Sequence, residues 1–155
     1  MTSGSPATPR QMFARMQRAW LAQTGLEAGQ LAEDVVIEAP FAPPGHPRRV
    51  EGRDQVLAHY GPQQAAFPAR FEEVRNVVIH DTTDPEVIVV EYELAGTVLA
   101  SGRQASAAFV GILRVREGKT VLWREYQNVL AIAQALGKLP ALLANAASQP
   151  DGASR

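Results

Sequence analysis

The chain contains no cysteine, which excludes a disulfide framework and a cysteine nucleophile. Its formal net charge is only −1 at pH 7, so it lacks the basic excess that is typical of nucleic-acid-binding proteins. No apolar run is long enough to cross a membrane, and the opening MTSGSPATPR has no apolar segment of the kind found in secretory signals. We therefore expect a cytoplasmic protein that binds neither nucleic acid nor membrane.

Motifs for metals and cofactors are also missing from the sequence. The three histidines, His46, His59 and His80, are scattered and have no carboxylate at ligand spacing. The sequence has no phosphate-binding loop, no GxGxxG dinucleotide motif and no GxSxG nucleophile motif. We therefore expect neither a metal nor a cofactor.

The composition that is present is that of an ordinary globular domain. Hydrophobic residues make up 46% and charged residues 20% of 155 residues, enough for one domain with a core. Residues 9–144 are expected to form this domain. The short, polar ends, residues 1–8 and 145–155, are expected to be disordered.

The first half of the chain shows helical signals around one strand. Thr8 and Gln11 have the spacing of a capping box, with Pro9 at the first helical position, which predicts a helix over residues 9–23. The pattern then predicts a short helix, a strand, a proline-rich loop and another short helix, over residues 27–32, 34–39, 39–49 and 53–60.

In the second half the hydrophobic period changes to two, which predicts long strands. These are expected over residues 70–80, 87–100, 103–116 and 119–128. Short links rich in turn residues join them, so they should form an antiparallel meander. A final helical stretch, 129–144, should break or kink at Pro140. The order predicts an α+β fold in which a curved antiparallel sheet wraps around the N-terminal helices as a cone-shaped α+β barrel with an internal cavity.

One face of the predicted strand 103–116 consists largely of small residues. This face carries Ala105, Ala107, Phe109, Gly111, Leu113 and Val115. Because protein cores rarely leave space empty, either a helix side chain such as Trp20 or a ligand should fill it. On the preceding strand Tyr92 lies on one face, whereas Glu91 and Glu93 share the other, which we expect to be solvated.

The stretch VLWREYQNV, residues 121–129, places a carboxylate beside an apolar side chain. Strand alternation puts on one face the side chains of Val121, Trp123, Glu125 and Gln127. Glu125 is then either a surface group that pairs with a cation such as Arg124, Arg114 or Lys119, or an acid–base group in the cavity. The apolar face favours the second reading. In an apolar cavity the pKa of Glu125 should rise, and a carboxyl near neutrality can both donate and accept a proton.

Two motifs connect the chain to a known family. These are DVVIEAPFAPPG (residues 34–45), followed by EGR, and WREYQN (residues 123–128). With them, residues 9–137 resemble the SnoaL-like branch of the nuclear transport factor 2-like superfamily. Its members include ketosteroid isomerases, polyketide cyclases, limonene epoxide hydrolase and phenazine biosynthesis proteins. The resemblance implies a homodimer with one apolar cavity per subunit.

The resemblance also bears on individual residues. The two aspartates of the ketosteroid isomerases align with Ala39 and Gly111, so that isomerase's own chemistry is not expected. The WREYQN stretch resembles one in the phenazine biosynthesis A/B proteins, whose glutamate is the acid–base group, and this implies the same role for Glu125. Tyr60 matches a tyrosine near the isomerase active site.

These observations predict a cofactor-free cyclase, isomerase or dehydrating lyase. It would act by general acid–base catalysis on a small hydrophobic secondary-metabolite intermediate, such as the polyketides of antibiotic biosynthesis. Glu125 is the predicted catalytic residue. The predicted substrate-binding residues are Tyr60, Trp123, Gln127, Tyr92, Phe109, Trp20 and His59. One alternative is a non-catalytic small-molecule-binding protein of the same fold, and another is a structural dimerisation module whose interior is filled by side chains.

Overall fold

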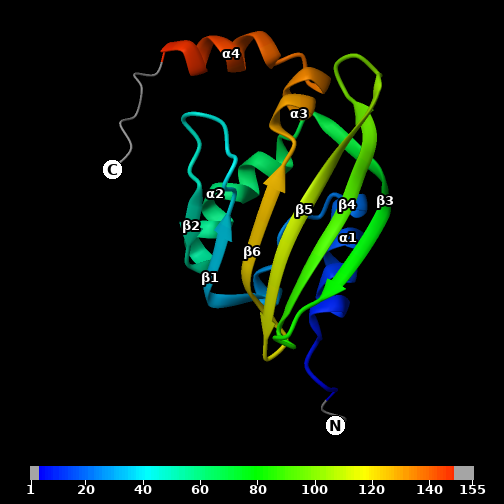
Figure 1. Ribbon diagram of the computed structural model, residues 1–155, viewed down its shortest axis with the longest axis vertical. Helices are drawn as coiled ribbons and strands as arrows, with labels where there is room; N and C mark the ends of the chain where they lie inside the picture. Colours follow the sequence, from blue (N-terminus) through cyan, green and yellow to red (C-terminus); the bar gives the residue numbers. More distant parts are fainter. Residues whose placement is uncertain (1–3, 149–155) are drawn as a thin grey trace.

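A computed structural model describes residues 4–148, which contain four α-helices, one 3-10 turn and six strands. In chain order the elements are α1 (Pro9–Ala22), η1 (Ala28–Gln30), β1 (Leu31–Glu38), β2 (Arg49–Glu51), α2 (Arg53–Ala65), β3 (Ala69–Asp81), β4 (Val87–Val98), β5 (Gln104–Arg116), β6 (Lys119–Gln127), α3 (Val129–Ala135) and α4 (Leu139–Ser148). Figure 1 shows them with these labels.

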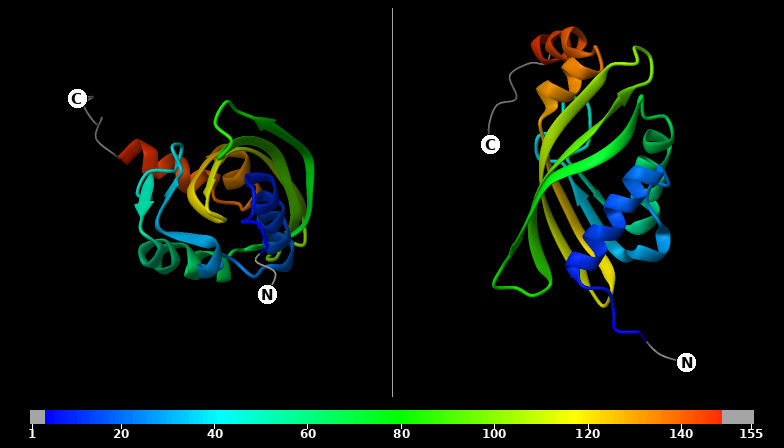
Figure 2. Two further views of the ribbon diagram at one scale, coloured as in Figure 1. Left: turned by 90° about the horizontal axis from the view of Figure 1, so that it is seen from below. Right: turned by 90° about the vertical axis from the view of Figure 1, so that its right-hand side faces the viewer.

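The six strands form one curved sheet in the order β2-β1-β6-β5-β4-β3. The predicted meander is confirmed, since β3 to β6 pair antiparallel with their neighbours in sequence. A purely antiparallel sheet was wrong, because β1 pairs parallel with β6. Figure 2 shows the sheet curving around α1 without closing on itself. The predicted α+β class, a curved sheet around the N-terminal helices, is confirmed.

Helix α1 is the element that fills the curve of the sheet. Its start is the predicted capping box, in which Gln11 N donates to Thr8 Oγ1 at 3.2 Å and Thr8 N donates to Gln11 Oε1 at 3.0 Å. Met12 and Phe13 are fully buried on the side that faces the sheet. The concave face of the sheet, covered by α1 and α2, therefore holds the core (Figure 2).

Several boundaries in the first half differ from the prediction. The short helix expected over residues 27–32 is only the 3-10 turn η1, because β1 already begins at Leu31. The proline-rich segment ends in a short strand, β2, which pairs with Val36–Glu38 once the prolines are past. Helix α2 continues to Ala65, although Pro62 lies within it. A tertiary contact accompanies this extension, since Leu26 N donates to Gln64 Oε1 at 3.1 Å. A glutamine contact across 38 residues leaves no local sequence signal.

The C-terminal segment also differs from the prediction in detail. It breaks between α3 and α4 at Gly137, whose φ of +68° suits glycine, rather than at Pro140 in the first turn of α4. Helix α4 reaches Ser148, so residues 145–148 are helical and not disordered. At the other end Ala7 packs against the core. The rest of the expected tails, residues 1–3 and 149–155, lies outside the described residues.

Candidate functional site

Strand β6 directs Glu125 toward the concave face of the sheet. In the pairing of β5 with β6, Gly111 lies opposite Glu125 and Phe109 lies opposite Gln127. Phe109 and Gly111 are buried, so this face is the inner one. The orientation therefore agrees with the one expected from strand alternation.

The carboxyl of Glu125 is held by two neutral donors. The hydroxyl of Tyr92, on β4, donates to Glu125 Oε2. The amide nitrogen of Gln127, two residues further along β6, donates to Oε1 at 2.7 Å. Both oxygens are thus engaged, and the plane of the carboxyl is fixed within the concave side of the sheet.

The reading of Glu125 as a surface ion pair is wrong. The cations proposed as its partners bind elsewhere: Arg124 Nε lies 2.5 Å from a carboxyl oxygen of Glu38, and Lys119 donates to a backbone carbonyl at 2.5 Å. Arg114 lies 3.4 Å from Asp84. Glu38 points to the outer side, where it pairs with Arg124 and Arg49, and Glu125 on the inner side has only neutral partners.

Burial controls the titration of this group. Desolvation raises the pKa of Glu125 above the ordinary carboxyl value, whereas the hydrogen bonds from Gln127 and Tyr92 act in the opposite direction. The pKa of Tyr92 lies well above its usual range because of burial and the nearby charge of Glu125. The pKa of Tyr60, on α2, is raised by the same two causes. Both phenols therefore remain donors at neutral pH.

Five aromatic rings surround the carboxyl on the inner side. They are contributed by α1, β4, β5 and β6, and they are Phe13, Trp20, Tyr92, Phe109 and Trp123. Tyr92 stacks on Phe109 at 5.2 Å and on Trp20 at 5.1 Å between ring centroids. Phe13, which is fully buried, lies 5.7 Å from Tyr92. The interior around Glu125 is therefore largely aromatic.

The space expected at Gly111 is filled by Trp123, neither by Trp20 nor by a ligand. A Cβ atom at Gly111 would lie 2.2 Å from the Cη2 atom of the Trp123 indole. No residue with a side chain fits there while the indole keeps its place. The other small residues of this face, Ala105 and Ala107, lie further along β5 toward its hairpin with β4, and both are only partly buried.

Most of the residues predicted to bind substrate lie together. Tyr92 and Gln127 contact Glu125, and the other aromatic residues line the interior, with Tyr60 half-buried beside them. His59 is the exception, because its Nε2 lies 3.1 Å from the amide nitrogen of Gln63, on the same helix. The His59 ring also packs edge-on against Tyr60, at 4.7 Å between ring centroids, and the described part of the chain shows no hydrogen bond from His59 to the carboxyl.

Sequence reasoning missed two features of the site. It did not predict the contact between Tyr92 and Glu125, although both side chains lie on the inner face of the sheet. The strand register would have provided the signal, since Phe109 lies opposite Tyr92 and the next inner-face residue of β5, Gly111, lies opposite Glu125. It also left Phe13 out of the predicted site, whereas the ring of Phe13 contacts three of the aromatic side chains in the cluster.

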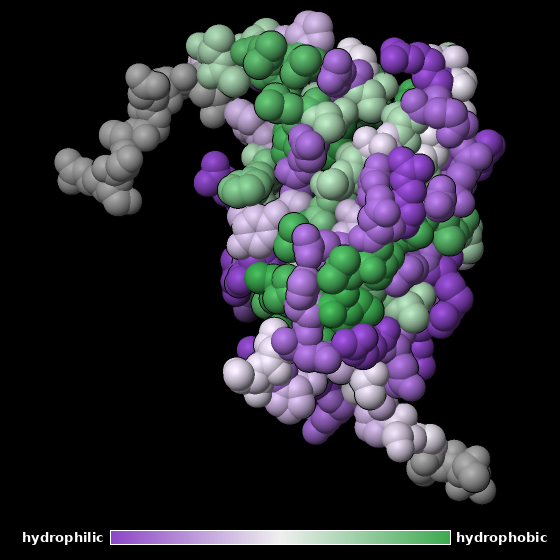
Figure 3. Space-filling view, turned by 45° about the vertical axis from the view of Figure 1, so that its right-hand side comes forward, coloured by the Kyte–Doolittle hydropathy of each residue, from purple (hydrophilic) through white to green (hydrophobic). Residues whose placement is uncertain are grey.

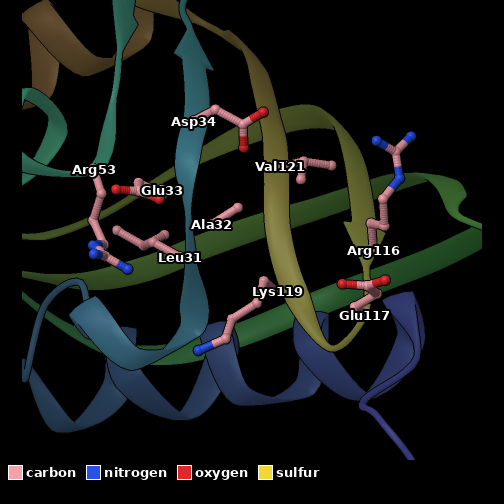
Figure 4. Close-up of a pocket in the computed structure, with 9 residues that line it drawn as sticks. All are labelled: Leu31, Ala32, Glu33, Asp34, Arg53, Arg116, Glu117, Lys119 and Val121. Atoms are coloured by element: carbon pink, nitrogen blue, oxygen red, sulfur yellow. The ribbon is translucent and has the colours of Figure 1, made fainter.

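The molecule has two hollows to compare with the position of Glu125. One, of about 290 Å³, lies where β1 separates from β6 and is lined by residues including Asp34, Arg53 and Lys119 (Figure 4). In Figure 4 Asp34 and Arg53 lie on opposite sides of β1. The other, of about 480 Å³, lies beside Phe41 and Tyr126, and three of the predicted site residues also line it: Tyr92, Phe109 and Gln127. Neither contains Glu125. Residues 4–148 contain no group of three metal-ligating side chains, and none of their helices is long and apolar enough to cross a membrane.

Comparison with known proteins identifies relatives. Residues 10–123 match the model of the SnoaL-like domain family. An uncharacterised PhzA/B-like protein of Pseudomonas aeruginosa is 33% identical over 106 residues, which cover 68% of this chain and 73% of that protein. The uncharacterised protein YesE of Bacillus subtilis is 26% identical over 110 residues, covering 68% and 70%.

Solved structures share the fold at low sequence identity. A Bacillus subtilis protein provisionally named an isomerase superposes with a TM-score of 0.74 at 20% identity, covering 84% of this chain and 93% of that one. A phenazine biosynthesis-related protein of Pseudomonas aeruginosa has a TM-score of 0.63 at 21% identity, covering 83% and 84%. A provisional polyketide cyclase of Pseudomonas putida has a TM-score of 0.65 at 17% identity, covering 83% and 98%.

Proposed function

The chain belongs to the SnoaL-like domain family, and from this premise we propose that it is a cofactor-free enzyme of the cyclase or isomerase type. One observation carries the proposal: the Glu125 carboxyl lies on the inner face of the sheet among aromatic rings and is oriented by Tyr92 and Gln127. Buried carboxyls with raised pKa values are typical of general acid–base sites.

In the proposed mechanism Glu125 moves a proton between two positions of the substrate. The ionised carboxyl removes a proton from a carbon next to a carbonyl group, and the electron pair of that C–H bond passes into the enolate. The protonated carboxyl then returns the proton to a second atom. Tyr92 and Gln127 stabilise the ionised carboxyl before the first step and after the second, and the neutral Tyr60 hydroxyl donates to the substrate oxygen, where the enolate charge develops.

The proposed substrate is a small hydrophobic intermediate of the polyketide type. Similarity to a provisional polyketide cyclase and to a phenazine biosynthesis-related protein supports this class. The aromatic lining also suits a flat, conjugated molecule, because such a molecule stacks on rings. If a neighbouring hydroxyl leaves during proton transfer, the same site performs a dehydration.

The second candidate is a binding protein of the same fold without catalysis. Two observations favour it. Ala39 and Gly111 align with the positions where the isomerases carry acids, and Trp123 occupies the space beside Gly111. Such a protein would hold the same ligands, but it would leave their C–H bonds intact. Proton exchange therefore separates the two candidates.

We further propose that the chain forms a homodimer through the outer face of the sheet. Three apolar side chains are exposed there: Phe41 is 62%, Val78 46% and Val110 38% exposed. Figure 3 shows a group of hydrophobic side chains on the surface of the sheet, bordered by hydrophilic ones. Two neighbouring glutamates of this face, Glu93 and Glu38, are paired with Arg75 and Arg124, so a second copy can cover these charges as pairs.

Solvent deuterium uptake by a panel of cyclic ketones and β-diketones, followed by mass spectrometry, tests the catalytic proposal. We expect the protein to accelerate the exchange and the Glu125→Gln variant to lose roughly 100-fold or more of that rate, since it keeps size and polarity but not the proton. Glu93→Gln, on the outer face, is the matched control and should exchange normally. A Glu125→Gln rate equal to that of the unmodified protein would leave only the binding function.

A further inference from the structure

The inner face of the sheet has a packed part and a partly open part, which meet at Trp123. Toward the turn between β5 and β6 the inner-facing side chains are buried, and they are Ile88, Val90, Leu113 and Val115. Met12 and Phe13 of α1 are equally buried and belong to the same core cluster. In the other direction, four residues of β5 and β6 on the same face are only partly buried, and they are Glu125, Gln127, Ala107 and Ala105. A bound molecule therefore finds accessible surface on one side of Trp123.

Gly111 allows the Trp123 indole to reach the part of the sheet that contains Glu125. Gly111 and Glu125 lie opposite each other on β5 and β6, and Leu113 lies opposite Trp123 in the next inner-facing pair. A Cβ atom at Gly111 would lie 2.2, 2.6 and 3.0 Å from the Cη2, Cζ3 and Cζ2 atoms of the indole. Three atoms of the six-membered ring thus occupy the place that a side chain opposite Glu125 would take.

Aromatic rings hold the indole on its other sides. Trp123 is 8% exposed, and its ring lies 6.4 Å from Phe13, 6.3 Å from Tyr92 and 6.3 Å from Trp20 between centroids. A close-packed side chain resists displacement because its neighbours would have to move with it. A ligand group that reached this place would overlap the indole, and adding atoms to a packed place is unfavourable.

The open side extends away from Trp123 along small side chains of β5. From Gly111 to Ala105 the strand covers about 20 Å, at about 3.3 Å for each residue step. Ala107 and Ala105 lie on the inner face of this stretch, and Ile132 of α3 packs against the neighbouring core. A molecule that reacts at Glu125 therefore ends at the indole and extends toward the two alanines.

We propose that Trp123 and Gly111 form an end wall of the substrate site, which excludes bulky substituents on the reacting carbon. The carbon that exchanges a proton with Glu125 lies beside the indole, so a branched group attached to it would enter the place that the ring fills. The inference rests on the proposed function because it uses Glu125 as the base. It narrows the substrates to ring ketones that react at an open CH2 group at one end, with the remaining rings along Ala107 and Ala105.

An end wall differs from an ordinary binding residue in the effect of shortening its side chain. Removing a side chain that attracts the substrate weakens the binding of every substrate. Shortening a wall instead leaves an apolar space, and such spaces bind apolar groups of matching size. Trp123→Leu should therefore admit substrates that the unmodified protein rejects.

Two isomeric ketones, 6-isopropyl-1-tetralone and 2-isopropyl-1-tetralone, test the proposal. Each has a single enolisable carbon, C2, and the branched group lies either remote from that carbon or on it. We expect the unmodified protein to accelerate solvent deuterium uptake by the 6-isomer at least about 10-fold more than by the 2-isomer, each relative to its uncatalysed rate. Trp123→Leu should reduce this discrimination to less than about threefold through a faster reaction of the 2-isomer.

Trp20→Leu is the matched control for the loss of an indole. It shortens the other tryptophan of the aromatic cluster, while the Trp123 indole and Gly111 keep their side chains. This variant should keep the preference for the 6-isomer. Trp123→Phe is a smaller change at the wall and should give an intermediate preference, so the test does not depend on the folding of Trp123→Leu. Thermal unfolding verifies that each variant is folded at the assay temperature.

Equal acceleration of the two isomers by the unmodified protein overturns the inference and leaves the proposed function standing. A preference that persists unchanged in both Trp123→Phe and Trp123→Leu has the same meaning. If no ketone exchanges, the catalytic proposal fails, and calorimetric affinities for the same two isomers test the wall by themselves. The 6-isomer should then bind at least about 10-fold more tightly, which corresponds to about 1.4 kcal/mol, and Trp123→Leu should remove the difference. Equal affinities would overturn the wall as well.

Discussion

Charged residues on the two faces of the sheet differ in their partners. Arg124 and Glu125 are neighbours on β6, yet Arg124 points outward and pairs with Glu38, whereas Glu125 points inward and meets only neutral donors. The outer face remains in contact with water and neutralises its charges locally. The inner face keeps one carboxylate among rings. This difference is the reason for proposing that the inner carboxylate serves a ligand, because the fold would be easier to assemble without it.

The largest expected effect tests the aromatic lining of the inner side. Phe13 is fully buried, whereas Phe41 on the outer face is 62% exposed. Phe13→Ala should lower the free energy of unfolding by about 3–5 kcal/mol, because it removes a fully buried ring and leaves a cavity. Phe41→Ala should change it by less than about 0.5 kcal/mol. Urea denaturation measures both, and similar values for the two would contradict the contrast between the faces.

The next prediction concerns the close approach of Trp123 to β5. Gly111→Ala places a Cβ atom in the position of the indole ring, so it should destabilise the protein by about 1–3 kcal/mol and shift tryptophan fluorescence. Ala108→Ser, at an exposed position on the outer face of the same strand, is the control and should stay within about 0.5 kcal/mol of the unmodified protein. A Gly111→Ala variant as stable as that control would show that the indole can move freely.

The pH dependence of stability should have opposite signs for the two faces. The hydrogen bonds of Glu93, first of all from Arg75, lower its pKa from 4.5 to about 2, so its stabilisation is present above pH 4.5 and is lost as the pH falls toward 2. The pKa of Glu125 is raised in the folded protein, so as the pH rises this carboxyl ionises in the unfolded chain before it ionises in the folded one. The free energy of unfolding therefore falls as the pH rises from 4.5 through the pKa of the folded state.

Unfolding curves of Glu93→Gln and Glu125→Gln across this pH range measure the two slopes. Relative to the unmodified protein, Glu93→Gln should lose stability as the pH rises above 2, and Glu125→Gln should gain it as the pH rises above 4.5. A profile of Glu125→Gln parallel to that of the unmodified protein would mean that Glu125 titrates like a solvated carboxyl.

The smallest effect on stability is expected from the outer apolar side chains. Val110→Lys adds a charge at an exposed position opposite Glu91, so the fold should keep its stability to within about 0.5 kcal/mol. If the outer face joins two copies, the same change should convert a dimer into a monomer. Light scattering after size-exclusion chromatography reports the mass. A dimer that survives the substitution would place the interface elsewhere.

Local patterns predicted much of the fold correctly. The capping box at Thr8 placed the start of α1, and the period-two pattern found the four strands of the meander, because both signals act between residues close in sequence. The boundaries that failed depend on distant contacts. The extent of α2 accompanies the bond between Leu26 and Gln64, and the parallel pairing of β1 with β6 joins segments almost ninety residues apart, as in Ile37 opposite Trp123.

For the site, the sequence by itself determined which side chains share a face. Alternation along β6 is enough to put Glu125 with Trp123 and Gln127, because successive residues of a strand must point to opposite sides. Only the tertiary structure determined which residues contact these side chains. The register of three strands brings the Tyr92 hydroxyl to Glu125 and lays the Trp123 indole over Gly111. Such contacts depend on how separate strands align and pack, and packing is a property of the whole fold rather than of any one segment.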